Sequence, residues 1–568
     1  MINNLKDLSQ TLDYSFIHFL IPDPSSTSEG DDHKPRQVSS GHYVLVKPEP
    51  IHEPIYIIHS KSLFEELSIS DDLAQVDDFK KTFSANLSQC PELMNKYGWA
   101  CGYALSIYGT EYTNNCPFGT GNGYGDGRAI SIYEGVINGK RLEMQLKGAG
   151  KTPYCRGADG RAVLRSSIRE FLAQEHMYAL GVPTSRSLTL YTSKSETVQR
   201  PWFHPDSHST EPELMIEEPI AISTRVAPSF IRVGQIELFA RRVRNQAHPQ
   251  AMNELQKIVS HLITREYPEI NTSSSSPMDK LIRLAIEFRS RLTSLMADWI
   301  RVGYCQGNFN SDNTALGGFT LDYGPFGFID EFKVDYQPWT GGGTHYSFFN
   351  QPQAAFQNFK MFCHSLSPLF EDNQIAIEEL NQVILDFPEI IQQKMMDMWA
   401  SKLGLETFQP SLFNELIQLL QKTSVDYTIF FRELSNIPEQ FSPLTKSFYQ
   451  TDCKDKTPMG EWLQWHEQWL NMIRTTNPED INATTPESTQ KLSEIMKGVN
   501  PKYILREWFM VPAYQLANEG KYDLIREINE VMTNPYAEQS KEFEDKYYQK
   551  KPLDLFNIAG VSHVSCSS

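Results

Sequence analysis

A glycine-rich segment between residues 119 and 128 is the first part of the chain whose residue types suggest chemistry. It reads Gly-Thr-Gly-Asn-Gly-Tyr-Gly-Asp-Gly-Arg, with glycine at every second position. Glycine has no Cβ, so its backbone can adopt positive φ angles and bring N–H groups close to a phosphate. The segment does not match the GxxxxGK[ST] pattern of a P-loop, and a surface loop would explain the glycines equally well. The strand expected directly after Arg128 favours phosphate binding.

Three further places carry side chains suited to phosphate or metal chemistry. Lys147 follows a strand-like run, and Glu170 lies on a predicted helix, where a carboxylate can hold the lysine in an ion pair. Farther along, the loop 308–313 and Asp322 of an Asp-Tyr-Gly motif offer the hard oxygen atoms that Mg²⁺ and Mn²⁺ prefer. Taken singly, each of these is more commonly a solvated side chain or part of a turn.

The order of these segments resembles that of protein kinases, which also have a glycine-rich loop, a strand lysine, a helix glutamate, an asparagine loop and a D-x-G motif. The kinase catalytic loop H-R-D-x-x-x-x-N does not match, however. If Asn313 takes the place of its metal-binding asparagine, Asn308 stands where the catalytic aspartate should be, and an amide cannot accept the proton. Asp312 supplies a carboxylate beside Asn313. The sequence therefore predicts a kinase-like site with altered chemistry.

Composition excludes several classes of protein. The chain has 568 residues, with 52 Lys and Arg against 70 Asp and Glu, a formal charge of −18. Such a surface repels nucleic-acid backbones, so we expect no nucleic-acid partner. No run of 18 apolar residues indicates a membrane span, so we expect no membrane partner.

Targeting signals and cysteine usage predict the compartment. The first twenty residues resemble neither a signal peptide nor a transit peptide. The eight cysteines contain no CxxC pair, which is typical of a reducing environment. We therefore expect a cytoplasmic protein, or a mitochondrial one if its source is eukaryotic.

Local patterns predict the elements that position these residues. Strand patterns at 129–136 and 141–146 flank Asn-Gly, which suits a tight hairpin, and helical spacing follows at 160–180. Further strands are expected at 187–191, 219–226 and 318–321, and helices at 278–302, 375–385 and 411–420. Two inserts, 198–214 and 271–278, look like surface loops. The fold class is therefore α+β, with a mixed first part and a helical second part.

Longer motifs make the chain resemble the selenoprotein O family, kinase-fold proteins described as protein adenylyltransferases. The matching stretches are residues 125–129, 146–150, 152–154, 157–166, 225–232, 310–313 and 322–328, and the Cys-Ser-Ser terminus also fits. Family members often pair their C-terminal cysteine or selenocysteine with a second cysteine. Here His563 stands three residues before Cys566, and residues 330–339 contain no cysteine, so a redox pair within the chain is in doubt.

The resemblance implies a protein-kinase-like two-lobed fold, with a mixed N-lobe at residues 1–227 and an enlarged helical C-lobe at 228–568. It implies that ATP lies reversed relative to a kinase, so that its α-phosphate faces the acceptor. Glu170 would pair with Lys147, Asp312 would accept the proton, and Asn313 and Asp322 would hold Mg²⁺ or Mn²⁺. The residues expected at the nucleotide are Gly125, Gly127, Arg128, Lys147, Asp159, Gly160, Arg225, Arg232 and Asp322.

These observations favour a metal-dependent transfer of AMP from ATP to Ser, Thr or Tyr hydroxyls of other proteins. Pyrophosphate gathers negative charge as it leaves, so the enzyme needs fixed cations around it. Arg225 and Arg232 suit that task; they lie on one helix face or on a loop followed by a helix. The alternatives are UMP transfer from UTP, phosphoryl transfer by a divergent kinase, and an ATP-binding scaffold without catalysis.

Overall fold

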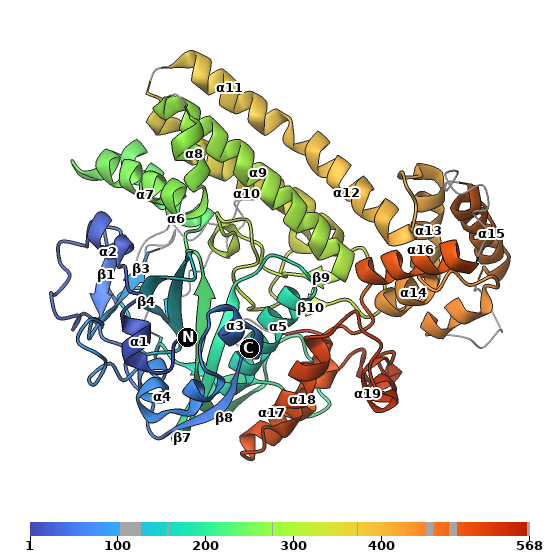
Figure 1. Cartoon of the computed structure of the whole chain (residues 1–568), viewed down its shortest axis with the longest axis horizontal. Coiled ribbons are helices and arrows are strands. Elements are labelled where there is room, and N and C mark those ends of the chain that lie inside the picture. Colours follow the sequence, from blue (N-terminus) through green and yellow to red (C-terminus); the bar gives the residue numbers. More distant parts are fainter. Residues whose placement is uncertain are drawn as a thin grey trace.

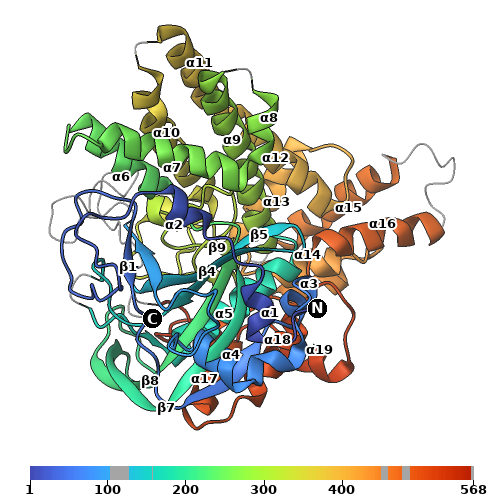
Figure 2. The ribbon, with the colours of Figure 1, turned by 60° about the vertical axis from the view of Figure 1, so that its left-hand side comes forward.

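The computed structural model describes residues 1–102, 127–155, 158–274, 276–371, 373–449, 458–475 and 486–564. It combines a large antiparallel sheet with many helices (Figure 1). The sheet is formed by the first part of the chain, and the helices that follow lie above it and to one side (Figures 1 and 2). A mixed first part and a helical second part are therefore confirmed.

The large sheet positions the lysine and one of the two arginines predicted above. Its strands lie in the order β1 (Tyr43–Val46), β3 (Gly98–Cys101), β4 (Ala129–Ile137), β5 (Lys140–Lys147), β8 (Leu214–Ala227), β7 (Arg186–Trp202) and β2 (Pro54–His59), and β6 (Ala162–Val163) pairs with β8. A second, small sheet joins β9 (Tyr304–Cys305) to β10 (Gly327–Phe328).

The predicted hairpin is present as β4 and β5. Asn138 and Gly139 form its turn with φ angles of 50° and 76°, the left-handed region that this dipeptide tolerates. The register pairs Ala129 with Lys147, so the lysine ends its strand beside the start of β4.

Helix α5 (Leu164–Ala179) carries Glu170 and is shorter at its start than expected. Residues 162–163 pair with β8 instead, which keeps the chain extended until Leu164. The helix turns a fully buried apolar side, including Ile168 and Phe171, toward the core. Gly181 follows its end with a φ of +74°.

The remaining helices form most of the second part. They are α6 (Val233–Arg244), α7 (Ala251–Glu266), α8 (Pro268–Ser273), α9 (Pro277–Val302), α10 (Gln351–Leu366), α11 (Gln374–Leu385), α12 (Phe387–Leu403), α13 (Pro410–Lys422), α14 (Tyr427–Leu434), α15 (Met459–Thr475), α16 (Pro486–Val499), α17 (Glu507–Asn518), α18 (Asp523–Met532) and α19 (Lys541–Tyr547). The predicted helices at 278–302, 375–385 and 411–420 correspond to α9, α11 and α13. Helix α9 packs against α10, α11 and α12. Four short helices lie near the start of the chain: α1 (Leu5–Ser9) and α2 (Ser15–Phe19) precede β1, and α3 (Lys61–Glu66) and α4 (Asp77–Phe83) lie between β2 and β3. Within the described ranges no helix is long and apolar enough to cross a membrane.

Three local predictions are wrong. The strand expected at 318–321 is reduced to single bridges of Thr320 with Thr184 and Thr314. No ladder forms, because the backbone N–H groups of Gly318 and Thr320 donate to two separate segments, at Ala315 and Pro183. The insert 198–214 is a loop only at residues 203–213, because β7 continues to Trp202 and β8 begins at Leu214, so the rest of the insert extends the hairpin. Residues 271–278 are mostly helical, since α8 and α9 are separated by only three residues.

His176 joins α5 to the C-terminal segment by hydrogen bonds. The Nδ1 atom of His176 lies 2.8 Å from the carbonyl oxygen of Met532, and its Nε2 accepts the backbone N–H of Leu505 at 3.3 Å. Both ring nitrogens are therefore used by the neutral tautomer, and a second ring proton would displace the Leu505 donor. Burial lowers the pKa of His176 to about 4.

Acid should destabilise the protein through this histidine. An unfolded chain binds a proton near the ordinary pKa of 6.5, whereas the folded chain does so only near 4. The contribution is fully present above pH 6.5 and is lost as the pH falls toward 4, by about 2 kcal/mol at pH 5. Urea unfolding at pH 7.5 and pH 5 measures it. His176→Gln should lose correspondingly less stability between the two values, and an equal loss in both proteins would contradict the assignment.

Candidate active site

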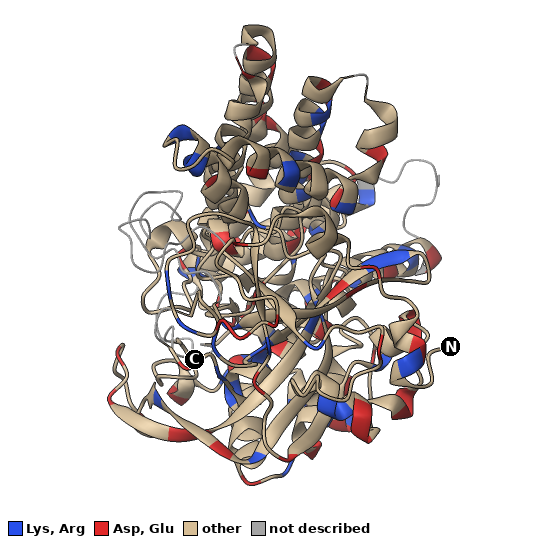
Figure 3. Cartoon of the chain, turned by 90° about the vertical axis from the view of Figure 1, so that its left-hand side faces the viewer, with Lys and Arg blue, Asp and Glu red and all other residues tan. Residues whose placement is uncertain are grey.

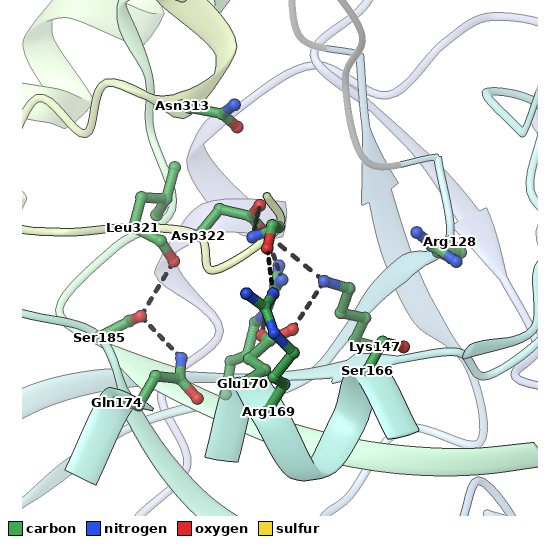
Figure 4. A network of polar contacts seen from close by, with 12 residues as sticks. Arg128, Lys147, Ser166, Arg169, Glu170, Gln174, Ser185, Asn313, Leu321 and Asp322 are labelled. Atoms are coloured by element: carbon green, nitrogen blue, oxygen red, sulfur yellow. Dashed lines mark hydrogen bonds and ion pairs between the residues drawn. The ribbon is translucent and has the colours of Figure 1, made fainter. Parts of the chain in front are cut away.

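Lys147 of β5, Glu170 of α5 and Asp322 of the loop before β10 meet in one cluster (Figure 4), which Arg225 of β8 completes. Lys147 Nζ lies 2.6 Å from Glu170 Oε2 and 3.5 Å from Asp322 Oδ1. Arg225 donates from Nε to the other oxygen of Glu170, and its terminal nitrogen lies 2.5 Å from Asp322 Oδ1. The predicted lysine–glutamate pair is therefore present, with Arg225 and Asp322 joined to it.

The cluster is almost closed to solvent. The Arg225 and Glu170 side chains are 0% and 1% exposed, and those of Lys147 and Asp322 are 10% and 13% exposed. Two cations and two carboxylates balance in charge, which is how buried charges are tolerated. The arrangement keeps the Lys147 and Arg225 cations pointed at the carboxylate of Asp322.

Two side chains fix the position of Asp322 by donating hydrogen bonds to the backbone carbonyl oxygens of Asp322 and of Leu321 before it. Gln306 donates from Nε2 to the carbonyl oxygen of Asp322 at 2.8 Å. Gln174 of α5 donates to Ser185 Oγ at 2.8 Å, and Ser185 donates to the carbonyl oxygen of Leu321 at 2.9 Å (Figure 4). The same helix that carries Glu170 therefore also holds the residue before Asp322.

Arg169, next to Glu170, fixes the residues after Asp322. It donates to the carbonyl oxygens of Gly324 at 2.8 Å and Phe326 at 2.6 Å, and its Nε lies 2.7 Å from Glu507 Oε2 at the start of α17. The Asp-Tyr-Gly segment is thus tied through one arginine to the C-terminal part of the chain.

The asparagine loop is organised around Asn310, whose role sequence reasoning missed. Its Oδ1 accepts the backbone N–H groups of Asp312 at 3.0 Å and Asn313 at 3.2 Å, and its Nδ2 donates to Asn308 Oδ1 at 3.1 Å. An asparagine that caps a short turn in this way is a recognisable local signal. Asp312 is fully buried within the turn.

The residues at this point fit a divalent cation. Asn313 donates its amide nitrogen to the Asn308 carbonyl oxygen at 2.7 Å, which leaves its amide oxygen on the side facing Asp322 (Figure 4). An amide oxygen and a carboxylate are hard donors of the kind that Mg²⁺ and Mn²⁺ take. Within the described ranges no group of three or more His, Cys, Asp or Glu side chains is placed to hold a metal ion. Bound phosphate and water would therefore have to complete the coordination, as is usual for Mg²⁺ at nucleotide sites.

Arg225 stands on a strand and Arg232 at a helix start, so neither predicted arrangement is present: the two do not share a helix, and Arg225 does not lie in a loop. Arg225 lies on β8 and Arg232 is the N-cap residue of α6. Arg232 forms a bridge with Ala315, and the next N–H, of Val233, donates to the Thr314 carbonyl oxygen at 3.0 Å. The second arginine is thereby joined to the loop that carries Asp312.

Two of the predicted glycines lie where a side chain would collide with backbone. A Cβ at Gly127 would be 2.2 Å from the Tyr154 carbonyl oxygen. Gly160 has a φ of +72°, and a Cβ there would be 2.1 Å from the Gly150 carbonyl oxygen. These glycines fold the chain tightly beside β5. Gly125, and with it most of the glycine-rich segment, lies outside the described residues, as does Cys566.

Asp159 has a partner that the sequence did not suggest. Both terminal nitrogens of Arg200 lie 2.8 Å from its carboxylate oxygens, and the backbone N–H of Arg161 donates to it at 2.9 Å. Burial raises the pKa of Asp159, but these donors outweigh it and lower the pKa below its ordinary value. Arg128 donates to the Arg161 carbonyl oxygen at 3.2 Å. Arg161 therefore joins Asp159 and Arg128, and the insert expected to be a loop supplies Arg200, which binds Asp159.

The order and geometry of these residues agree with comparisons with known proteins. The family model described as protein adenylyltransferase SelO matches residues 30–532. The chain belongs to the SelO family. Members of this family are nucleotidyltransferases, and the chain is an enzyme of that class.

Relatives of similar length support the same assignment. A protein nucleotidyltransferase YdiU of Tolumonas auensis is 35% identical over 570 residues, covering 98% of this chain and 99% of the relative. YdiU of Aromatoleum aromaticum is 34% identical over 573 residues with the same coverage. YdiU of Xanthomonas campestris pv. campestris is 34% identical over 535 residues, covering 92% and 94%. The SelO resemblance thus extends through both parts of the chain.

Proposed function

We propose that this member of the SelO family transfers AMP from ATP to Ser, Thr or Tyr hydroxyls of other proteins and releases pyrophosphate. The observation that carries the proposal is the buried cluster of Lys147, Glu170, Arg225 and Asp322. Preorganised cations beside a metal-binding carboxylate are what a nucleotidyl transfer needs, because charge moves onto the departing pyrophosphate.

The residues divide the work as follows. Lys147, Arg225 and Arg232 neutralise the β- and γ-phosphates, while Asn313 and Asp322 would hold Mg²⁺ or Mn²⁺. The bound cation would supply charge neutralisation at the phosphates. Asp312 orients the acceptor hydroxyl and takes its proton as the hydroxyl oxygen bonds to the α-phosphorus. The bond from the α-phosphorus to the bridging oxygen breaks, and both of its electrons leave with pyrophosphate.

A kinase-like two-lobed arrangement is part of this proposal. The last strand of the large sheet in chain order, β8, ends at Ala227, and the helices of the second part begin at Val233, which supports lobes at residues 1–227 and 228–568. The clustered residues come from both parts. A nucleotide bound at them would lie between the two.

Charge on the molecule agrees with a small polyphosphate ligand rather than a polynucleotide. Acidic and basic residues are interspersed over the sheet and the helices (Figure 3), and the chain carries a net −18. UMP transfer from UTP remains a second candidate, since YdiU relatives are named only as nucleotidyltransferases.

Labelled ATP separates these functions. We expect label from the α-phosphate to stay on an acceptor protein, or on the enzyme itself, after denaturing electrophoresis, and label from the γ-phosphate to leave as pyrophosphate. The same measurement with α-labelled UTP compares the two nucleotides. Retention of label from the γ position alone would identify a kinase. Retention of neither label, with nucleotide binding intact, would identify a scaffold.

A further inference from the structure

The face of the sheet that carries Lys147 also carries a chain of hydrogen bonds that the proposed mechanism does not use. Side chains alternate along a strand, so Glu143, Gln145 and Lys147 of β5 point to the same face. Across the ladder, Gln145 lies directly opposite Arg225. In an antiparallel pair, opposite residues have Cβ atoms about 5 Å apart. Gln145 is therefore a neighbour of the proposed phosphate site.

The hydrogen bonds of this chain run in one direction. Gln145 donates from Nε2 to Ser131 Oγ at 3.2 Å, and Ser131 donates to Glu143 Oε1 at 2.5 Å. The amide oxygen of Gln145 is left without a partner among the described residues, although Gln145 is only 2% exposed. A buried amide oxygen without a donor is rare in folded proteins.

This direction is unsuited to a polyphosphate. Ionised phosphate oxygens only accept hydrogen bonds, and so does the amide oxygen of Gln145. A half-turn of the amide group would present Nε2 to the phosphate instead, with little movement of other atoms. Ser131 would then have to donate to Gln145, and Glu143 would have to donate to Ser131, which requires a proton on Glu143.

Glu143 lies where such a proton is readily held. The charged and titratable groups around it are Arg265 of α7, whose terminal nitrogen lies 3.8 Å from Glu143 Oε2, Glu134 of β4, Arg232 at the start of α6 and Cys101 of β3. Arg265 is shared, because it also pairs with Glu134 and donates to the Pro228 carbonyl oxygen. Arg265 offsets the effect of burial only in part, so burial raises the pKa of Glu143 to about 7.

We propose that nucleotide binding reverses the Glu143–Ser131–Gln145 chain and takes up one proton onto Glu143, so that Gln145 donates to the polyphosphate. Gln145 is then a further nucleotide-binding residue, and Ser131 and Glu143 are positioning residues that act through it. This inference rests on the proposed function, because it needs a polyphosphate beside Arg225.

Proton uptake makes the affinity for nucleotide depend on pH in a defined direction. Below pH 7, Glu143 already holds its proton and binding takes up little. Above pH 7, binding draws a proton from the buffer, and this group lowers the affinity by up to about tenfold for each pH unit.

Calorimetry counts the proton directly. An α,β-methylene analogue of ATP with Mg²⁺ is titrated at pH 8 in buffers of different ionisation enthalpy. Wild-type protein should take up nearly one proton more than Glu143→Gln, whose amide can donate to Ser131 without titrating. Between pH 7.5 and 8.5 titration of Glu143 should lower the affinity of wild type for the analogue by up to about tenfold, and Glu143→Gln should lack this part of the fall.

Hydroxyl variants keep the test decisive if Glu143→Gln does not fold. Ser131→Ala breaks the chain and should lose the extra proton, whereas Ser131→Thr keeps the hydroxyl and should retain it. Glu266→Gln, which removes another buried carboxylate, should also retain it. Equal proton counts in wild type, Glu143→Gln and Ser131→Ala would overturn the inference alone. A lack of nucleotide binding at every pH would overturn the proposed function with it.

Discussion

Replacement of Asp322 by asparagine is expected to lower nucleotide transfer by about a thousandfold or more. The carboxylate of Asp322 accepts from both Lys147 and Arg225, and we propose that it holds the metal together with Asn313. An amide at this position carries no charge for the metal and puts N–H groups near two cations. Initial rates of α-label transfer measure the loss.

A matched variant shows whether the loss of activity comes from the position of Asp322 or only from the change in net charge. Asp335→Asn removes the same charge from an exposed position of the neighbouring segment, and its rate should stay within about twofold of wild type. Transfer by Asp322→Asn at more than a tenth of the wild-type rate would show that Asp322 does not hold the metal.

Replacement of Arg225 by methionine is expected to destabilise the protein as well as to inactivate it. Arg225 is 0% exposed and stands between Glu170 and Asp322. Its loss leaves two buried carboxylates to share Lys147, at a cost of about 3–5 kcal/mol in the free energy of unfolding. Urea unfolding and nucleotide titration measure the two effects.

Arg225→Lys is the informative companion of the methionine variant. It keeps the positive charge but lacks the planar fork that bonds two carboxylates at once, so it should recover part of the stability and little of the activity. If the methionine variant unfolds at the wild-type urea concentration, the cluster contributes no net stability. If it also transfers label normally, Arg225 has no role in the reaction.

Residues close in sequence could be predicted well. The hairpin at Asn138 and the helix α9 follow from local turn chemistry and apolar spacing. The ion pair between Lys147 and Glu170 joins residues only 23 apart, on two elements that the sequence already suggested. The order of the motifs was enough to bring Asp322 to the same place.

Contacts between distant segments could not be predicted in this way. The hold of Arg200 on Asp159 depends on a hairpin whose polar composition resembles a loop, because its strands extend beyond the core and are exposed on many positions. The strand expected near Thr320 failed because its backbone bonds are divided among separate segments. Neither outcome leaves a local pattern in the sequence.

The attachment of α5 to the C-terminal segment sets a time scale for making the enzyme. Arg169 and Glu507 are 338 residues apart, and His176 and Met532 are 356 apart. A ribosome adding about 5–20 residues per second makes the partners of α5 roughly 17–70 s after the helix itself. During that interval Arg169 and His176 of the helix that carries Glu170 lack their C-terminal partners. A nascent chain therefore gains these contacts of α5 only after residues 507–532 have been made.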